Sequence, residues 1–188
     1  MNKRQNTDLE FELLERVAGG DQEAFKLLYD QINESLFFFI YRLVKDKELS
    51  EDVHVEVFTE VWRSAKKYKG NSKVKTWIFG IAKNLAMNAL RKQKKHLNID
   101  DFEHPSNDEA IDTEQVTRKA MIKGALLKIS MKHREILDLV FFHEMNYQEV
   151  AEVLNVPVNT VKTRVFYAKQ ALRKTFLKMG IKSNELYT

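Results

Sequence analysis

The chain has 188 residues, enough for one or two small domains, and 44% of them are hydrophobic, which suffices for packed cores. It contains no cysteine, which excludes a disulfide framework, a thiolate nucleophile and cysteine-based zinc sites, and which fits a reducing, cytoplasmic setting. The net charge of +4 is modest, and no apolar run approaches the roughly 20 residues that span a bilayer, so we expect neither secretion nor membrane insertion.

The charged residues fall into three blocks along the chain. Residues 62–95 and 158–178 contain lysines and arginines but no acidic residue, whereas residues 98–115 contain acids and neither lysine nor arginine. Each block by itself is typical of a solvated surface. Two separate basic blocks nevertheless favour a nucleic-acid partner, because phosphate neutralisation is the main source of sequence-independent binding.

Apolar residues recur at helical spacing along most of the chain, and Pro105 and Pro157 are its only prolines, so we expect an all-α fold. A first helix is predicted to end at residues 19–20, which are both glycine. Asp21 is expected to cap a second helix over residues 23–43.

Ser50 is expected to cap a third helix, because Glu51 and Asp52 would then lie in its first turn, where negative charge complements the helix dipole. This helix is predicted to be two-sided, with acids on one face. Its apolar stripe consists of Val53, Val57, Phe58 and Val61.

After a loop over residues 68–72, a fourth helical pattern over residues 77–91 combines cationic with aromatic side chains. Residues 96–114 are acidic, have few strongly apolar positions and include a proline, so we predict a flexible linker there. The helical pattern then resumes. We therefore predict two small helical domains, residues 6–95 and residues 115–177, joined by that linker.

The strongest local pattern is a helix-turn-helix over residues 146–172. Asn146 and Glu149 form a capping-box pair at its start, and residues 155–157 form a turn that contains proline. Apolar residues recur at helical spacing on both sides of this turn. They are Tyr147, Val150, Ala151 and Leu154 before it, and Val158, Val161, Val165, Ala168 and Leu172 after it.

The face opposite the second of these stripes carries no acid and suits DNA. Lysine and arginine pair with phosphates or guanine edges, asparagine pairs with adenine, and threonine or an aromatic ring contacts the thymine methyl group. The competing interpretation is an ordinary helical hairpin with a basic surface. The residues predicted to contact DNA are Asn159, Thr160, Lys162, Thr163, Arg164, Phe166, Tyr167 and Lys169.

Residues 146–165 resemble region 4 of the extracytoplasmic-function (ECF) sigma factors of the sigma-70 family, in which two helices flank a proline turn. Residues 21–29, 50–58 and 76–86 are similar to the opening helix, the polymerase-binding helix and the closing segment of region 2 in that family. The resemblance covers residues 21–176, and with it most of the chain.

The resemblance implies an alternative sigma factor, which binds core RNA polymerase and directs promoter-specific initiation by recognising two promoter elements and promoting DNA melting. It implies that the helix-turn-helix reads the minus thirty-five element, and that an inhibitory anti-sigma protein is a further partner. Several positions depart from the family: Val55 stands where glutamine is typical, Asn159 where glycine is usual, Thr163 where serine is usual, Tyr167 where arginine is frequent, and Ile129-Ser130 where leucine-proline is common. The residues implied to contact the clamp helices of the largest polymerase subunit are Glu51, Asp52, Glu56, Phe58 and Trp62.

The basic and aromatic part of the first domain suits melted DNA, because opening is favoured when unpaired bases are stacked or pocketed while phosphates are held. In the family this part reads the minus ten element, and a loop corresponding to residues 69–74 captures a non-template base. For Trp77 the competing interpretation is a core residue, which is the commoner role of tryptophan in an apolar stripe. The predicted minus ten residues are Lys67, Tyr68, Asn71, Lys73, Lys75, Thr76, Trp77, Lys83, Asn84 and Arg91.

The main alternative is a helix-turn-helix transcriptional regulator that is not a polymerase subunit, and another is a structural adaptor with acidic helices. A regulator has no need for the two signatures within residues 50–91, and an adaptor leaves the helix-turn-helix unexplained. The sequence has no phosphate-binding glycine loop, no glycine-flanked serine and no metal-ligand pair at helical spacing. We therefore expect no catalysis, no cofactor and no metal site, and each of the scattered histidines is expected to be a surface or satisfied core residue.

Overall fold

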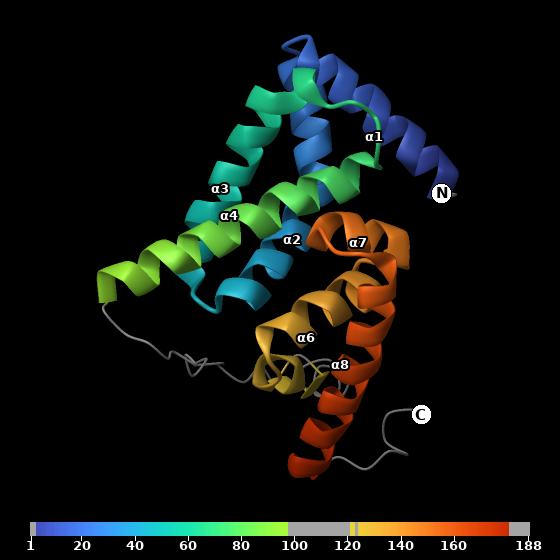
Figure 1. Ribbon diagram of the computed structural model, residues 1–188. Helices are drawn as coiled ribbons and strands as arrows, with labels where there is room; N and C mark the ends of the chain where they lie inside the picture. Colours follow the sequence, from blue (N-terminus) through green and yellow to red (C-terminus); the bar gives the residue numbers. More distant parts are fainter. Residues whose placement is uncertain (1–2, 98–120, 123, 181–188) are drawn as a thin grey trace.

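The computed structural model describes residues 3–97, 121–122 and 124–180, and every regular element in these ranges is helical (Figure 1). An N-terminal unit comprises α1 (Lys3–Ala18), α2 (Gln22–Val44), α3 (Lys47–Ser64), a short 3₁₀ turn η1 (Ala65–Lys67) and α4 (Val74–Leu97). A C-terminal unit contains α6 (Met131–Leu137), a π-helical segment η2 (Asp138–Phe142), α7 (Tyr147–Leu154) and α8 (Val158–Lys178). The all-α prediction with two small helical domains is confirmed.

Helix α4 continues through His96 and Leu97, where the linker was predicted to begin. The rest of that linker, residues 98–114, lies outside the described residues. None of the described helices is long and apolar enough to cross a membrane.

The predicted start of α2 is confirmed. Helix α1 ends at Ala18, and Gly20 adopts a left-handed φ of +91° that favours glycine. Asp21 then accepts hydrogen bonds from the backbone N–H groups of Glu23 and Ala24 at 2.9 and 3.0 Å. These contacts satisfy two of the donors that a helix start leaves unpaired.

The predicted start of α3 is wrong. The helix begins at Lys47, and the cap is Asp46, whose carboxylate accepts from the N–H of Leu49 at 3.0 Å. Ser50 lies inside the helix, fully buried, and its hydroxyl donates back to the Asp46 carbonyl. An aspartate one turn upstream offered the stronger cap, because its carboxylate is charged.

Helix α2 forms the centre of the N-terminal unit, with α1, α3 and α4 packed around it. Its buried face includes Leu28, Leu36 and Phe39, and the Phe39 ring lies 5.1 Å from that of Phe79 on α4. Burying one such side chain contributes roughly 1.5–3 kcal/mol. The four residues of the apolar stripe predicted for α3 are all buried here as well.

The C-terminal unit contains the predicted helix-turn-helix. Asn146 and Glu149 form a complete capping box, and α7 ends at Leu154. Its C-cap is Asn155, whose φ of 53° lies in the left-handed region. Pro157 stands directly before α8, whose inward side buries Val161 and Val165. The turn therefore separates the two helices at the predicted residues.

The two units pack directly against each other. Helix α7 lies against α4, and α6 lies against α2 (Figure 1). The main apolar core runs through both units, from Leu13 to Ala168. The sequence carried no periodic signal for this contact, because it joins residues far apart in the chain.

Candidate nucleic-acid and protein interfaces

An acidic face runs along α3. Glu51, Asp52 and Glu56 are all exposed, and Val55 between them is 65% exposed. Lys47 lies 4.0 Å from Glu51, but both side chains are open to solvent and such a pair holds little energy. The face is therefore available to a basic partner.

Aromatic side chains border this acidic face. Trp62 is 38% exposed, whereas Phe58 is only 5% exposed. Phe25 on α2 lies edge-on to both, with ring centroids 5.2 Å from Trp62 and 6.1 Å from Phe58. Tyr29 packs on Phe58 at 4.6 Å. Phe58 thus packs under Phe25 and Tyr29, and Phe25 in turn contacts Trp62.

Phe25 and Tyr29 were not among the predicted site residues. They are four residues apart on α2, as Phe58 and Trp62 are on α3. Side chains at that spacing share one face of a helix. The sequence therefore contained enough information to predict an aromatic cluster between these two helices.

A hollow of ≈ 580 Å³ lies beside the loop between η1 and α4. This volume falls within the range of about 300–1,000 Å³ that ligand sites occupy. We call it the loop hollow. Its lining residues are Phe11, Tyr68, Gly70, Asn71, Ser72, Lys73, Val74, Asn146, Glu149 and Glu152.

Three of the predicted minus ten residues, Tyr68, Asn71 and Lys73, meet at the loop hollow. The Tyr68 hydroxyl donates to the Ser72 carbonyl, and its ring lies 5.1 Å from Trp77. Burial, with the negative charges of Glu10 and Glu152 nearby, raises the pKa of the Tyr68 phenol above its usual value. Tyr68 is therefore a neutral donor there.

Two predicted minus ten residues lie in the protein interior. Thr76 is only 3% exposed, and Trp77 is half-buried against the apolar core. These positions favour supporting roles under the loop. The structural contact of Trp77 with Tyr68 holds that ring in place.

The remaining predicted minus ten residues extend along α4 and η1. Lys75 and Lys83 are partly buried, whereas Lys67, Asn84 and Arg91 are exposed. The guanidinium of Arg91 donates to the side chain of Asn88. Arg91 lines a second groove, which it shares with Asp52 and Glu56 of the acidic face.

The predicted DNA-binding face of α8 is open to solvent. Its exposed members are Asn159, Lys162, Thr163, Phe166, Tyr167 and Lys169. Thr160 and Arg164 are partly buried at its edges. Phe166 and Tyr167 lie edge to face, with centroids 5.5 Å apart, and both are more than half exposed. The helix therefore presents cations, amides and aromatic rings together.

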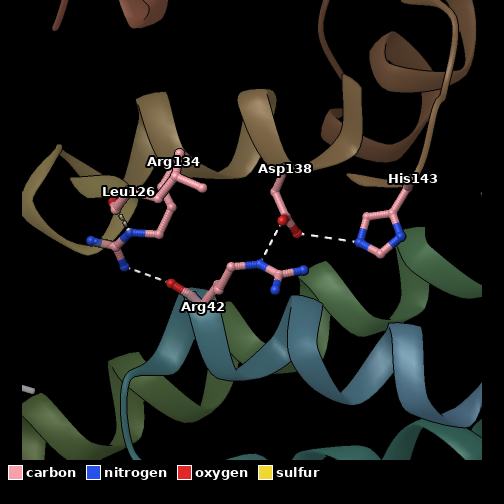
Figure 2. Close-up of polar contacts among 5 residues, drawn as sticks. All are labelled: Arg42, Leu126, Arg134, Asp138 and His143. Carbon is pink, nitrogen blue, oxygen red and sulfur yellow. Dashed lines mark hydrogen bonds and ion pairs between the residues drawn. The ribbon is translucent and has the colours of Figure 1, made fainter. Parts of the chain in front are cut away.

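A buried polar cluster joins the two units (Figure 2). Arg42 Nε on α2 lies 2.5 Å from Asp138 Oδ1 on η2, and Asp138 Oδ2 lies 3.3 Å from His143 Nε2. Arg134 on α6 donates to the Arg42 carbonyl at 2.5 Å and to the Leu126 carbonyl at 3.0 Å. We call Arg42, Arg134, Asp138 and His143 the interdomain cluster.

Within the interdomain cluster, the Asp138 carboxylate pairs with Arg42, and Arg134 donates to backbone carbonyls. Burial lowers the pKa of His143, and the hydrogen bond and charge of Asp138 only partly oppose this effect. His143 is thus neutral, and the Asp138 carboxylate is balanced by Arg42. The signal that sequence reasoning missed is Arg42 itself, an arginine within an apolar stretch of a buried helix.

Comparisons with known protein families match each of the two units separately. Residues 28–96 match the family model described as Sigma-70 region 2, and residues 125–174 match that described as Sigma-70, region 4. The first match lies in the N-terminal unit and the second in the C-terminal unit.

The chain is similar along most of its length to curated relatives. It is 30% identical over 176 residues to the RNA polymerase sigma-H factor of Pseudomonas aeruginosa, covering 87% of this chain and 91% of the relative. It is 28% identical over 174 residues to the ECF RNA polymerase sigma factor SigW of Bacillus subtilis, covering 86% and 93%.

A solved structure shares the fold. The sigma factor RpoE, in its complex with the anti-sigma factor NepR from Bartonella quintana, matches with a TM-score of 0.65 at 22% identity. The match covers 81% of this chain and 96% of that chain.

Proposed function

The chain belongs to the ECF group of the sigma-70 family and is an alternative sigma factor of RNA polymerase, and from this premise we propose the roles of its individual surfaces. The observation that supports the assignment best is that one chain carries an acidic, aromatic-edged face on α3 and a basic, acid-free face on α8. The alternative of a regulator that is not a polymerase subunit is not favoured, because it leaves the first face without a role.

We propose that the acidic face of α3 docks on core RNA polymerase. Glu51, Asp52 and Glu56 would meet basic residues of the clamp helices, and Trp62 would supply buried apolar area at the centre of the contact. Tryptophan is enriched among residues that dominate binding energy at interfaces. Phe58 would contribute indirectly, because its ring packs on Phe25, and Phe25 lies edge-on to Trp62.

The loop hollow and the cations of α4 are proposed to hold the melted minus ten strand. Tyr68 and Asn71 line a space large enough for an unpaired base, and Lys73, which also lines it, would hold a backbone phosphate. The exposed face of α8 is proposed to enter the major groove at the minus thirty-five element, as recognition helices of helix-turn-helix proteins do.

The chain is proposed to act by recognition and melting alone, in the cytoplasm with the polymerase, and not as an enzyme. An inhibitory protein is a further proposed partner, since the solved relative RpoE was crystallised with an anti-sigma factor.

The decisive experiment is in vitro transcription with purified bacterial core polymerase on a promoter library from the source genome. Promoter-specific transcripts that require this protein are the expected result. DNA binding without core association or initiation would instead establish the regulator.

A further inference from the structure

The C-terminal unit covers part of the surface assigned to the minus ten strand. Asn146, Glu149 and Glu152, at the start and exposed side of α7, form one wall of the loop hollow. Lys73 Nζ lies 2.5 Å from Glu149 Oε1, and the Glu149 side chain is only 12% exposed. The carboxylate thus occupies the position at Lys73 that a phosphate would take.

A second carboxylate of the C-terminal unit faces both proposed DNA surfaces. Glu135 on α6 is 7% exposed, and burial raises its pKa, while the charges of Lys83, Arg164 and Lys132 oppose that shift. Its Oε1 lies 3.9 Å from Arg164 Nη1. Lys83 is one of the proposed minus ten residues, and Arg164 is one of the proposed minus thirty-five residues. Glu135 therefore interacts with one cation from each set.

The interdomain cluster fixes this arrangement from the interior. Besides the contact of Arg42 with Asp138, Lys45 Nζ donates to the Leu127 carbonyl at 2.6 Å. The His143 ring packs edge-on to Phe39 and Phe79, with centroids 5.8 and 4.5 Å away. Polar and apolar contacts therefore both close the same boundary between the two units.

We propose that this arrangement is an autoinhibited closed state, in which Glu149 and Glu135 neutralise the lysines that the melted minus ten strand requires. Glu149 acts as an internal phosphate mimic at Lys73, and the nucleic acid and α7 compete for one site. The proposal rests on the proposed function, because it takes the minus ten assignment of Lys73 as given.

The closed state blocks one surface and leaves two open. The acidic face of α3 is exposed while α7 covers the loop hollow, and so is the basic face of α8 apart from Thr160 and Arg164 at its edges. The protein can therefore meet core polymerase in its closed form, and the C-terminal unit must leave α4 before melted DNA reaches Lys73. Because the C-terminal unit must be released first, the free protein has little capacity to hold melted DNA.

The test uses Glu149→Gln combined with Glu135→Gln in the full chain. Glutamine keeps the capping-box hydrogen bond to the Asn146 N–H, so the first change removes charge without removing the cap. Glu34→Gln, on an exposed position of α2, is the matched control for charge. The probe is a mixed-sequence single-stranded DNA 12-mer, and its dissociation constant is measured by fluorescence anisotropy.

The double variant is expected to bind the 12-mer about five- to twentyfold more tightly than the parent, in the range of ordinary coupling between sites, while the control stays within about twofold. Because the chain lacks cysteine, Lys92→Cys with Lys174→Cys allows two spin labels on exposed sites of α4 and α8. Their distance distribution is expected to be single in the parent and to lengthen in the double variant.

Two failures are distinguishable. Unchanged affinity and unchanged label distance in the double variant would overturn the closed-state proposal. Lys73→Gln, introduced into the double variant, tests the underlying assignment. If that change leaves 12-mer affinity unaltered, the minus ten role of Lys73 is overturned, and with it the competition on which the proposal depends.

Discussion

Arg42 and Asp138 form an ion pair across the boundary between the two helical units, with Nε and Oδ1 2.5 Å apart and side chains only 9% and 1% exposed. The residues are separated by about half of the chain, and the loss of either one would leave the other buried without its counterion. Removing one partner of such a pair is therefore far more harmful than removing both.

Asp138→Ala is expected to reduce the free energy of unfolding by roughly 3–5 kcal/mol, because Arg42 would keep its charge without a counterion in the interior. Urea denaturation followed by circular dichroism measures this loss. Arg42→Met combined with Asp138→Leu is the matched control and should recover most of the stability, since no charge is then left buried. Equal loss in the single and the double variant would contradict the account.

Stability should fall through His143 as the pH drops below about 6.5. Burial lowers the pKa of this imidazole in the folded state, and the positive charges of Lys75 and Arg42 act in the same direction, against Asp138. Protonation therefore favours the unfolded chain, so the stabilisation is complete above the ordinary histidine pKa of about 6.5 and declines below it, by at most about 1.4 kcal/mol per pH unit.

The pH effect is isolated by comparing the parent with His143→Gln in urea titrations at several pH values. Burial raises the pKa values of Glu10 and Glu135, which adds stability as the pH falls toward the ordinary carboxyl range, but this contribution is common to both proteins. The variant should show the flatter profile. If stability depends on pH equally in the parent and the variant, His143 is not the cause of the loss.

Trp62→Ala should weaken binding to core polymerase at least tenfold, because the exposed ring is the main apolar group beside the acidic face. Surface plasmon resonance with immobilised core enzyme gives the affinity. Phe38→Ala is a matched control, since Phe38 is also 38% exposed but lies on α2, where its ring packs beside Phe37. Comparable losses for both variants would argue against a defined docking site at Trp62.

Lys162→Ala combined with Arg164→Ala should weaken binding to the upstream promoter element and reduce its salt dependence, while core binding is unchanged. Promoter binding by the holoenzyme at several salt concentrations provides the measurement. Lys174→Ala, further along α8, controls for a general loss of positive charge. Unchanged promoter affinity at moderate salt would remove these two residues from the interface.

Local chemistry made much of the fold predictable. The cap at Asp21, the capping box at Asn146 and the exposed face of α8 follow from rules that act within one or two helical turns. The error at Ser50 has the same origin, because two residues competed for one cap and the charged one prevailed.

The contact between the units was not predictable in this way. Arg42 and Asp138 are aligned by tertiary packing, and neither has a neighbour in sequence that indicates the pairing. The contact of Lys73 with Glu149 was not predictable either. The sequence indicated DNA binding for Lys73 and a capping box for Glu149. The sequence did place an arginine, Arg42, within the apolar stretch of a buried helix. A buried charge is costly unless it is paired, so this residue indicated that a partner was needed.

The π-helical segment η2 brings Asp138 and His143 together. In a regular α-helix, residues five apart are turned about 140° from each other. The i→i+5 hydrogen bond from the His143 N–H to the Asp138 carbonyl, 3.2 Å long, instead brings the two side chains to the same side. Deleting one residue from positions 139–142 would restore the regular winding and separate the imidazole from the carboxylate. One extra residue in a single helical turn thus supplies the interdomain cluster with a polar contact that regular helical geometry would not allow.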